Sequence, residues 1–159
     1  MGSGKSHVLA AIAVKLLKEE KRVVYIPDCA LLASKPVHVL SSALYLAFRD
    51  DEKMIRNIAK ASSVRELTRI TCRFPQGQLY FIIDQMNAFS NRSDSAYVGD
   101  LTASLEDAAR NHFIIYSGGG HEEALRDKLR ATYRSVITMY GGFSNVPPPN
   151  YALSLKSRY

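Results

Sequence analysis

The six residues Leu-Tyr-Phe-Ile-Ile-Asp at positions 79–84 form a continuous apolar run that ends in an acid. A short run rich in β-branched and aromatic residues is typical of a buried strand. Residues 23–26 and 113–117 have the same character. Strands that read as apolar throughout, without polar alternation, are those of parallel sheets covered on both faces. These runs therefore predict a parallel sheet.

Helical patterns separate the predicted strands. Ser63 and Glu66 have the spacing of a capping box, which starts a helix. Alternating strands and helices predict the α/β class, with a three-layer α/β/α arrangement. The first helix is expected to follow Ser6 and to end at Lys21 and Arg22. The other expected helices cover residues 37–48, 52–61, 63–72, 99–111 and 121–133, and a last strand is expected at 136–139.

Length and composition indicate one ordinary globular domain. The chain has 159 residues, of which 47% are hydrophobic and 23% are charged. We assign the domain to residues 1–145, and residues 146–159, which begin with a proline-rich stretch, to an extended or disordered tail. No apolar run is long enough to span a bilayer, and no secretion signal is visible. The pattern excludes membrane insertion and leaves the compartment open.

Cysteines and charges point to no special class. Cys29 and Cys72 lack the spacing of a zinc site or a disulfide framework, so reduced and packed thiols are expected. The net charge is +6 with a pI near 9.4, which favours weak attraction to nucleic acid or to acidic membranes. The basic residues are scattered, however, and the densest clusters, residues 15–22 and 126–134, are interleaved with acids. We interpret these clusters as solvated helix faces.

The start of the chain contains the second half of a phosphate-binding loop. The motif G-x-x-x-x-G-K-[ST] joins a strand to a helix, and Gly4-Lys5-Ser6 supplies its end. Backbone N–H groups of residues 2–7, namely Gly2, Ser3, Gly4, Lys5, Ser6 and His7, would attract phosphate oxygens. Lys5 would reach the β and γ phosphates and Ser6 would ligate Mg²⁺. Taken alone, this start is equally typical of a flexible linker.

The acid at Asp84 supports the phosphate loop. A P-loop enzyme needs a carboxylate at the end of a buried strand to hold the magnesium ion. The alternative interpretation is a core strand whose acid lies at its solvent-exposed end. Gln85 follows, where many ATPases carry an acid that activates water. Since glutamine orients water but accepts protons poorly, binding is better supported than hydrolysis.

Other polar residues leave two interpretations open. Ser117 ends the strand at residues 113–117, where it could sense a γ phosphate or simply form a turn. Asn87 could face phosphates, although capping of the next turn is favoured. Surface solvation is favoured over a role as arginine finger for Arg126, Arg130 and Arg134. The four histidines share no ligand spacing.

Four strings, GSGKSHVLAA, KRVVYIPDC, LYFIIDQMNAF and MYGGFS, resemble the P-loop ATPase region of crinkler-type effector proteins, which is similar to that of retrotransposon hot-spot proteins. The resemblance covers roughly residues 1–144. It implies a STAND or AAA-like core that uses ATP and Mg²⁺, with Lys5, Ser6 and Asp84 as its site residues. It also implies secretion of the full-length protein and action in a host cell, often in the nucleus.

This sequence departs from the pattern of that family in one respect. In that family the strand before the phosphate loop is central in the sheet, and the sequence as given starts after it. We therefore expect a partial P-loop domain, either a fragment or a degenerate copy.

Three functions follow as hypotheses. The leading one is an ATP-binding P-loop domain, with hydrolysis to ADP and phosphate as its ancestral reaction. The second is a degenerate, non-catalytic module that binds protein partners or itself, which Gln85 favours. The third, direct nucleic-acid binding, rests on the basic pI alone.

Overall fold

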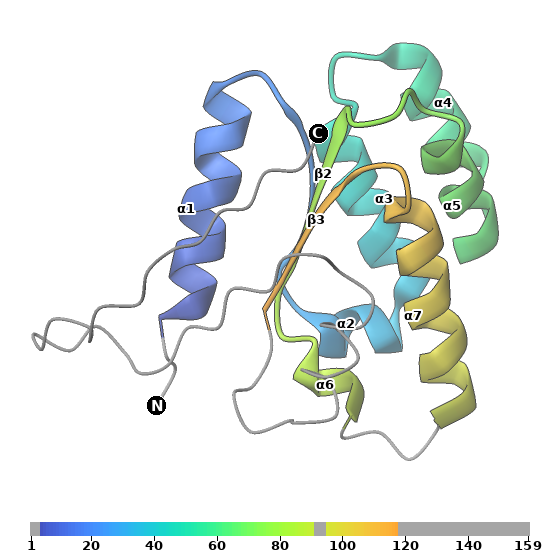
Figure 1. Cartoon of the computed structure of the whole chain (residues 1–159). Helices are drawn as coiled ribbons and strands as arrows, with labels where there is room; N and C mark the ends of the chain where they lie inside the picture. Colours follow the sequence, from blue (N-terminus) through green and yellow to red (C-terminus); the bar gives the residue numbers. More distant parts are fainter. Residues whose placement is uncertain (1–3, 91–94, 118–159) are drawn as a thin grey trace, which may run out of the picture.

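The computed structural model describes residues 4–90 and 95–117, and Figure 1 shows their arrangement. Several sequence predictions fall outside the described residues. They concern Gly2, Ser3, the helix at 121–133, the strand at 136–139 and the tail from residue 146. The elements are α1 (Lys5–Lys18), β1 (Arg22–Ile26), α2 (Cys29–Ser34), α3 (Pro36–Ala47), α4 (Glu52–Lys60), α5 (Val64–Cys72), β2 (Leu79–Ile83), α6 (Asn87–Ser90), α7 (Ser95–Ala109) and β3 (Phe113–Tyr116).

The described strands form a three-stranded parallel sheet in the order β1-β2-β3. Arg22 pairs with Leu79 at one end of β1 and Ile26 pairs with Ile83 at the other. On the other side of β2, Ile83 pairs with Tyr116. The parallel sheet predicted from the apolar runs is confirmed, and β2 is its central strand.

Helices cover both faces of this sheet, as Figure 1 shows. On one face, Leu9 and Ala13 of α1 pack with Val23 and Ile82. On the other face, Val24 and the neighbouring strand residues pack in one cluster with the helices from α2 to α7. Side chains alternate between the faces of a strand, which is why adjacent residues such as Val23 and Val24 belong to different clusters. The expected α/β class, with helices on both faces, is confirmed.

The helix start predicted at Ser63 is confirmed, and its capping box is formed in part. The Ser63 hydroxyl accepts a hydrogen bond from the Glu66 N–H, at 3.3 Å. The Glu66 carboxylate accepts from the Ser62 N–H at 2.7 Å, one residue before the cap itself. The Glu66 N–H is one of the donors that a helix start leaves without an intrahelical partner, whereas the Ser62 N–H lies before the helix.

Several boundaries differ from the sequence prediction. Helix α1 ends at Lys18 because the chain reverses through Glu20, whose φ is 57°, and Arg22 already belongs to β1. Helix α7 begins at Ser95 rather than near residue 99 and ends at Ala109. The short helices α2 and α6 were not predicted. Asp28 starts α2, since its carboxylate accepts from the N–H groups of Ala30 and Leu31.

Both cysteines are free, as expected, but only Cys29 is packed inside. Cys72 is exposed, so the prediction of a packed thiol is wrong there, because the last turn of α5 presents this position outward. Within residues 4–90 and 95–117, no helix has the length and apolar content needed to cross a membrane.

Candidate functional site

The candidate site lies at the edge of the sheet where the parallel strands end. Since α1 precedes β1 and packs along it, the start of α1 lies at this same edge, across the sheet from α2 and α6 (Figure 1). In α/β proteins with parallel strands, ligands bind at the carboxyl ends of the strands. Two groups of residues meet this description, the start of α1 and the turn after β2.

The first group is the start of α1. Gly4 precedes the helix with φ of 68°, a left-handed conformation that glycine adopts without steric cost. The first bond of the helix runs from the Val8 N–H to the Gly4 carbonyl at 3.2 Å. The N–H groups of the first turn therefore have no partner within the helix, and the first turn contains no acid. Lys5 is half-buried, whereas Ser6 and His7 are exposed.

The second group is centred on Asp84, which follows β2 directly. This carboxyl group is buried, with only 2% of the residue exposed. Its Oδ1 atom accepts hydrogen bonds from the Ser117 hydroxyl and, at 2.8 Å, from the Gln85 N–H. The interpretation of Asp84 as an acid at a solvent-exposed strand end is therefore wrong. Burial of a carboxylate costs free energy of folding unless hydrogen bonds compensate, and the two donors to Asp84 supply that compensation.

Ser117 joins this group from the neighbouring strand. Its N–H donates to the Ile83 carbonyl at 2.9 Å, and its own carbonyl accepts from the Met86 N–H at 2.9 Å. Ser117 is thus bonded to β2 through its backbone and to Asp84 through its hydroxyl. Sequence reasoning left sensing and turn formation open for this residue. The structure brings Ser117 and Asp84 into direct contact, an arrangement that favours neither interpretation by itself.

The turn after Asp84 is strained. Gln85 has φ of 60°, in the left-handed region that residues with a Cβ rarely adopt. Its N–H is bonded to Asp84, and the next N–H is bonded to Ser117, so the hydrogen bonds of the turn hold this conformation. Left-handed non-glycine residues cluster at functional sites. The Gln85 side chain is exposed, and Asn87 starts the short helix α6.

The two groups lie on the same face of the sheet. Tyr80 and Ile82 of β2 contact α1, and alternation places Asp84 on that face too. Leu9 packs in the cluster that contains Ile82. Lys5 precedes Leu9 by one helical turn of about 6 Å, and Asp84 lies about 6 to 7 Å beyond Ile82. Lys5 and Asp84 are therefore at a similar level of the sheet, although no ion pair joins them.

The negative charge of Asp84 affects two neighbouring side chains. Burial, aided by the charge of Asp84, raises the pKa of the Tyr25 phenol. Burial, with the charges of Asp28 and Asp84, raises the pKa of the Cys29 thiol to about 12. The Cys29 thiol also contacts the Met86 sulfur at 3.8 Å. Cys29 therefore stays protonated and serves as packing for the turn after β2.

The fit to a magnesium ion can be judged from the Asp84 carboxylate. Hard cations such as Mg²⁺ prefer oxygen ligands and are held by one or two carboxylates plus substrate phosphates. Both recorded hydrogen bonds of Asp84 use Oδ1, and Oδ2 has none among the described residues. The described ranges contain no group of three or more His, Cys, Asp or Glu residues able to hold a metal alone. The donor set therefore suits a metal that arrives with phosphate.

A hollow lies away from this candidate site, at the opposite end of the sheet. It encloses about 590 Å³ between α4 and α5, and its lining includes Lys53, Lys60, Arg69 and Arg73. Sequence reasoning missed this group, because its cations are spread over two helices. The available signal was helical spacing, seven residues from Lys53 to Lys60 and four from Arg69 to Arg73.

Comparison of the chain with protein-family models finds no matching family. Comparisons with curated proteins and with solved structures find no match either. The functional argument therefore depends on the geometry of the chain itself.

Proposed function

We propose that the edge formed by the start of α1 and the turn after β2 binds the phosphates of ATP together with Mg²⁺. One observation carries the proposal. A glycine-started helix, whose first N–H groups have no partner within the helix, and a half-buried lysine share an edge and a face with a buried, hydrogen-bonded carboxylate.

Each group has a distinct part in binding. The first-turn N–H groups and the positive end of the α1 dipole would attract phosphate oxygens. Lys5 would add a full positive charge at the same place. The Ser6 hydroxyl, exposed in the first turn, and the Asp84 carboxylate would hold the metal between them. Magnesium, when bound, screens the phosphate charges and polarises the phosphoryl oxygens.

Hydrolysis to ADP and phosphate is the reaction that this site would support. Gln85 follows Asp84, and its exposed amide would orient a water molecule towards the γ phosphate. Ser117 would position the Asp84 carboxylate through the hydroxyl bond. An amide cannot take up the proton of the attacking water, so turnover by this arrangement would be slow.

The second candidate is a module that binds ATP or a protein partner without turnover. The observation that favours it is the glutamine at position 85, where a basic carboxylate would speed hydrolysis. The resemblance to the ATPase region of crinkler-type effectors supports ATP as the ligand under both candidates.

Isothermal titration of the full chain with ATP and Mg²⁺ tests binding. We expect Lys5→Ala to abolish the binding heat. Lys18→Ala is the matched control, because Lys18 is an exposed lysine at the other end of the same helix. Unchanged affinity in Lys5→Ala would remove the proposal.

Phosphate release separates the two candidates. A protein that binds ATP but releases phosphate no faster than Lys5→Ala is the non-catalytic module. Release above that background supports the ATPase. A Gln85→Glu variant would then accelerate release if the missing carboxylate is what limits turnover.

A further inference from the structure

The pocket between α4 and α5 has a built lining that the candidate ATP site does not use. Both helices present one stripe of residues to it, at helical spacing. Lys53 and Lys60 come from α4, Arg69 comes from α5, and Arg73 follows α5 directly. Its floor contains the apolar side chains of Met54 and Ile70.

The lining is strongly positive. The pocket is lined by four basic residues and one acid, Glu66, which gives the lining a net charge of +3. The Glu66 carboxylate accepts hydrogen bonds from Ser62, the residue before the cap of α5. In the described part of the chain, none of the four cations that line the pocket takes part in an ion pair. Their mutual repulsion favours an anionic ligand.

The apolar floor determines which anion fits. Met54 and Ile70 are half-buried aliphatic side chains, and methionine adapts its shape to apolar partners. Phe74 is the aromatic residue of the lining. Its ring is already engaged, with the Phe48 ring at 5.0 Å and the Arg22 guanidinium over it at 5.7 Å. Single-stranded nucleic acids stack successive bases on several aromatic side chains, whereas this lining has one.

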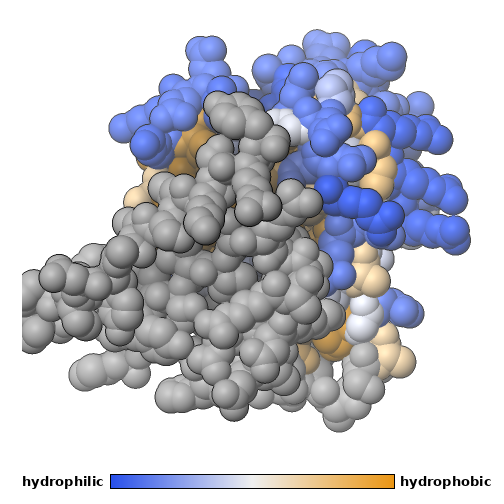
Figure 2. Space-filling model, viewed as in Figure 1, coloured by the Kyte–Doolittle hydropathy of each residue, from blue (hydrophilic) through white to orange (hydrophobic). Residues whose placement is uncertain are grey.

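We propose that the pocket between α4 and α5 binds an acidic, amphipathic peptide segment of a partner protein. Apolar side chains of the segment would contact Met54 and Ile70. Its carboxylates would meet the four cations at the rim. This is the mode in which an amphipathic helix lies in an apolar groove, with charge complementarity fixing its orientation. Figure 2 shows that the surface over α4 and α5 is mainly hydrophilic with apolar residues among it.

The proposal is independent of ATP binding, because the two sites lie at opposite ends of the sheet. Its test uses the full chain and fluorescence anisotropy with a labelled peptide made of glutamate and leucine at helical spacing. A peptide of equal charge, with serine in place of leucine, measures how much contact with the apolar floor contributes to the affinity. We expect the leucine peptide to bind at least about tenfold more tightly than the serine peptide.

Charge reversal locates the site. We expect the double variant Lys60→Glu and Arg69→Glu to lower the affinity for the leucine peptide by at least about tenfold. The matched control is Lys15→Glu with Lys18→Glu, which also reverses two cations in the last turn of a helix and lies outside the pocket. This control should change the affinity by no more than about twofold.

A second variant removes charge without adding repulsion, in case the reversal prevents folding. Lys53→Gln with Arg73→Gln keeps long side chains and should weaken the peptide by about threefold. No binding of the leucine peptide to the wild type, equal binding of both peptides, or equal losses in the pocket and control variants would each overturn the proposal. An oligothymidine strand that binds more tightly than the peptide, and is lost in the same variants, would overturn it in favour of nucleic acid.

Discussion

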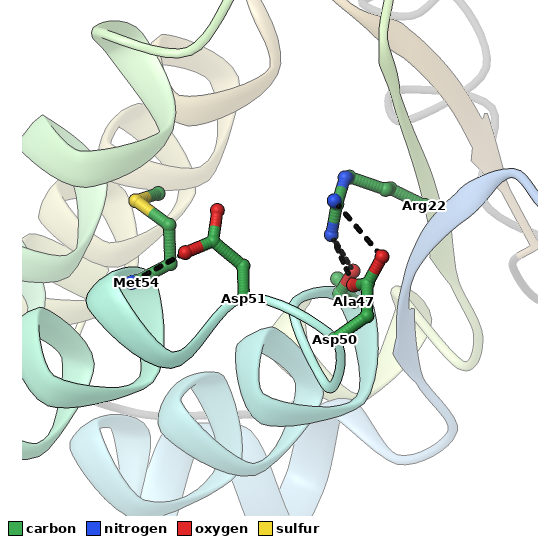
Figure 3. A network of polar contacts seen from close by, with 5 residues as sticks. All are labelled: Arg22, Ala47, Asp50, Asp51 and Met54. Carbon is green, nitrogen blue, oxygen red and sulfur yellow. Dashed lines mark hydrogen bonds and ion pairs between the residues drawn. The ribbon is translucent and has the colours of Figure 1, made fainter.

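Arg22 and Asp84 lie at opposite ends of the sheet, and their surroundings differ. Arg22 begins β1, where its guanidinium donates to Asp50 at 2.7 Å and to the Ala47 carbonyl at 3.0 Å (Figure 3). The same group lies over the rings of Phe48 and Phe74, at 5.2 and 5.7 Å. Both terminal nitrogens of the guanidinium donate hydrogen bonds within the protein, and its plane lies over two aromatic rings.

Asp84 is more buried than Arg22, yet one of its oxygens has no recorded bond among the described residues. The neighbouring turn is strained, and the helix start on the same face has N–H donors without a partner inside the helix. A charge satisfied within the protein stabilises the fold, whereas a buried charge with remaining capacity is typical of a binding site. Hydrogen-bond partners within the protein, more than burial, therefore distinguish a structural charge such as Arg22 from a candidate binding charge such as Asp84.

The largest expected effect is on ligand binding in Asp84→Asn. The amide keeps an oxygen that accepts from Ser117 and Gln85 but loses the charge that, in the proposed site, would hold a metal. We expect the affinity for ATP with Mg²⁺ to fall by at least about a hundredfold, and the free energy of unfolding to change by less than about 1 kcal/mol. Titration calorimetry and urea unfolding measure the two quantities. A large loss of stability with intact ATP affinity would place Asp84 with Arg22 as a structural charge.

Arg22→Gln should show the reverse pattern. The variant loses the ion pair, the bond to Ala47 and the contacts with two rings, and we expect the free energy of unfolding to fall by about 2 kcal/mol. ATP affinity should stay the same. Arg56→Gln serves as the control in urea unfolding, because Arg56 forms an exposed pair with Glu52 within α4. That control should cost less than about 0.5 kcal/mol.

The strain at Gln85 offers a smaller effect. Glycine adopts the left-handed conformation freely, so Gln85→Gly should raise the free energy of unfolding by about 1 kcal/mol. Gln85→Ala keeps the Cβ and should give no gain. Thermal unfolding of the two variants compares them directly. Equal stabilities would mean that the turn stores no strain.

The smallest effect is the pH dependence of the Arg22–Asp50 pair. The hydrogen bond from Arg22 lowers the pKa of the Asp50 carboxyl. The pair therefore contributes fully above the unfolded pKa of about 3.9, and the contribution is lost as the pH falls through the lower folded pKa. Since Asp50 is largely exposed, we expect Asp50→Asn to cost only about 0.5 kcal/mol at pH 7, and nothing in strong acid. Urea midpoints at both pH values test this, and a constant cost would contradict it.

Local patterns in the sequence were enough to predict the strands and most helices. The apolar run at residues 79–84 formed a buried strand, because its side chains pack on both faces of the sheet. The run at residues 113–117 also formed a strand, but the prediction that this strand is buried is wrong, since Phe113 is exposed and the rest of β3 is half-buried. The capping box at Ser63 was predictable because its bonds span only a few residues. Helix α2 was missed because six residues show little periodicity, although an aspartate before an apolar segment is a normal helix start.

Contacts between residues that are far apart in the chain could not be predicted from local sequence patterns. The burial of Asp84 and its bond to Ser117 depend on the order of the strands, which no local pattern specifies. Arg22 was grouped with solvated lysines, because its partners Asp50 and Phe74 are distant in the chain and close only in the fold. The ATP-binding role of Lys5, Ser6 and Asp84 stays a prediction, as do the roles of Gly2, Ser3, His7 and Gln85.

The register of β1 on β2 has a consequence for how the chain folds. Each residue of β1 pairs with one that lies 57 positions later, and α2, α3, α4 and α5 are contained in that interval. Closing so long a loop costs conformational entropy before the strands can bond. Pairings of high sequence separation slow folding, whereas helices form from local contacts. We therefore expect the intervening helices to assemble early and the junction of β1 with β2 to limit the folding rate.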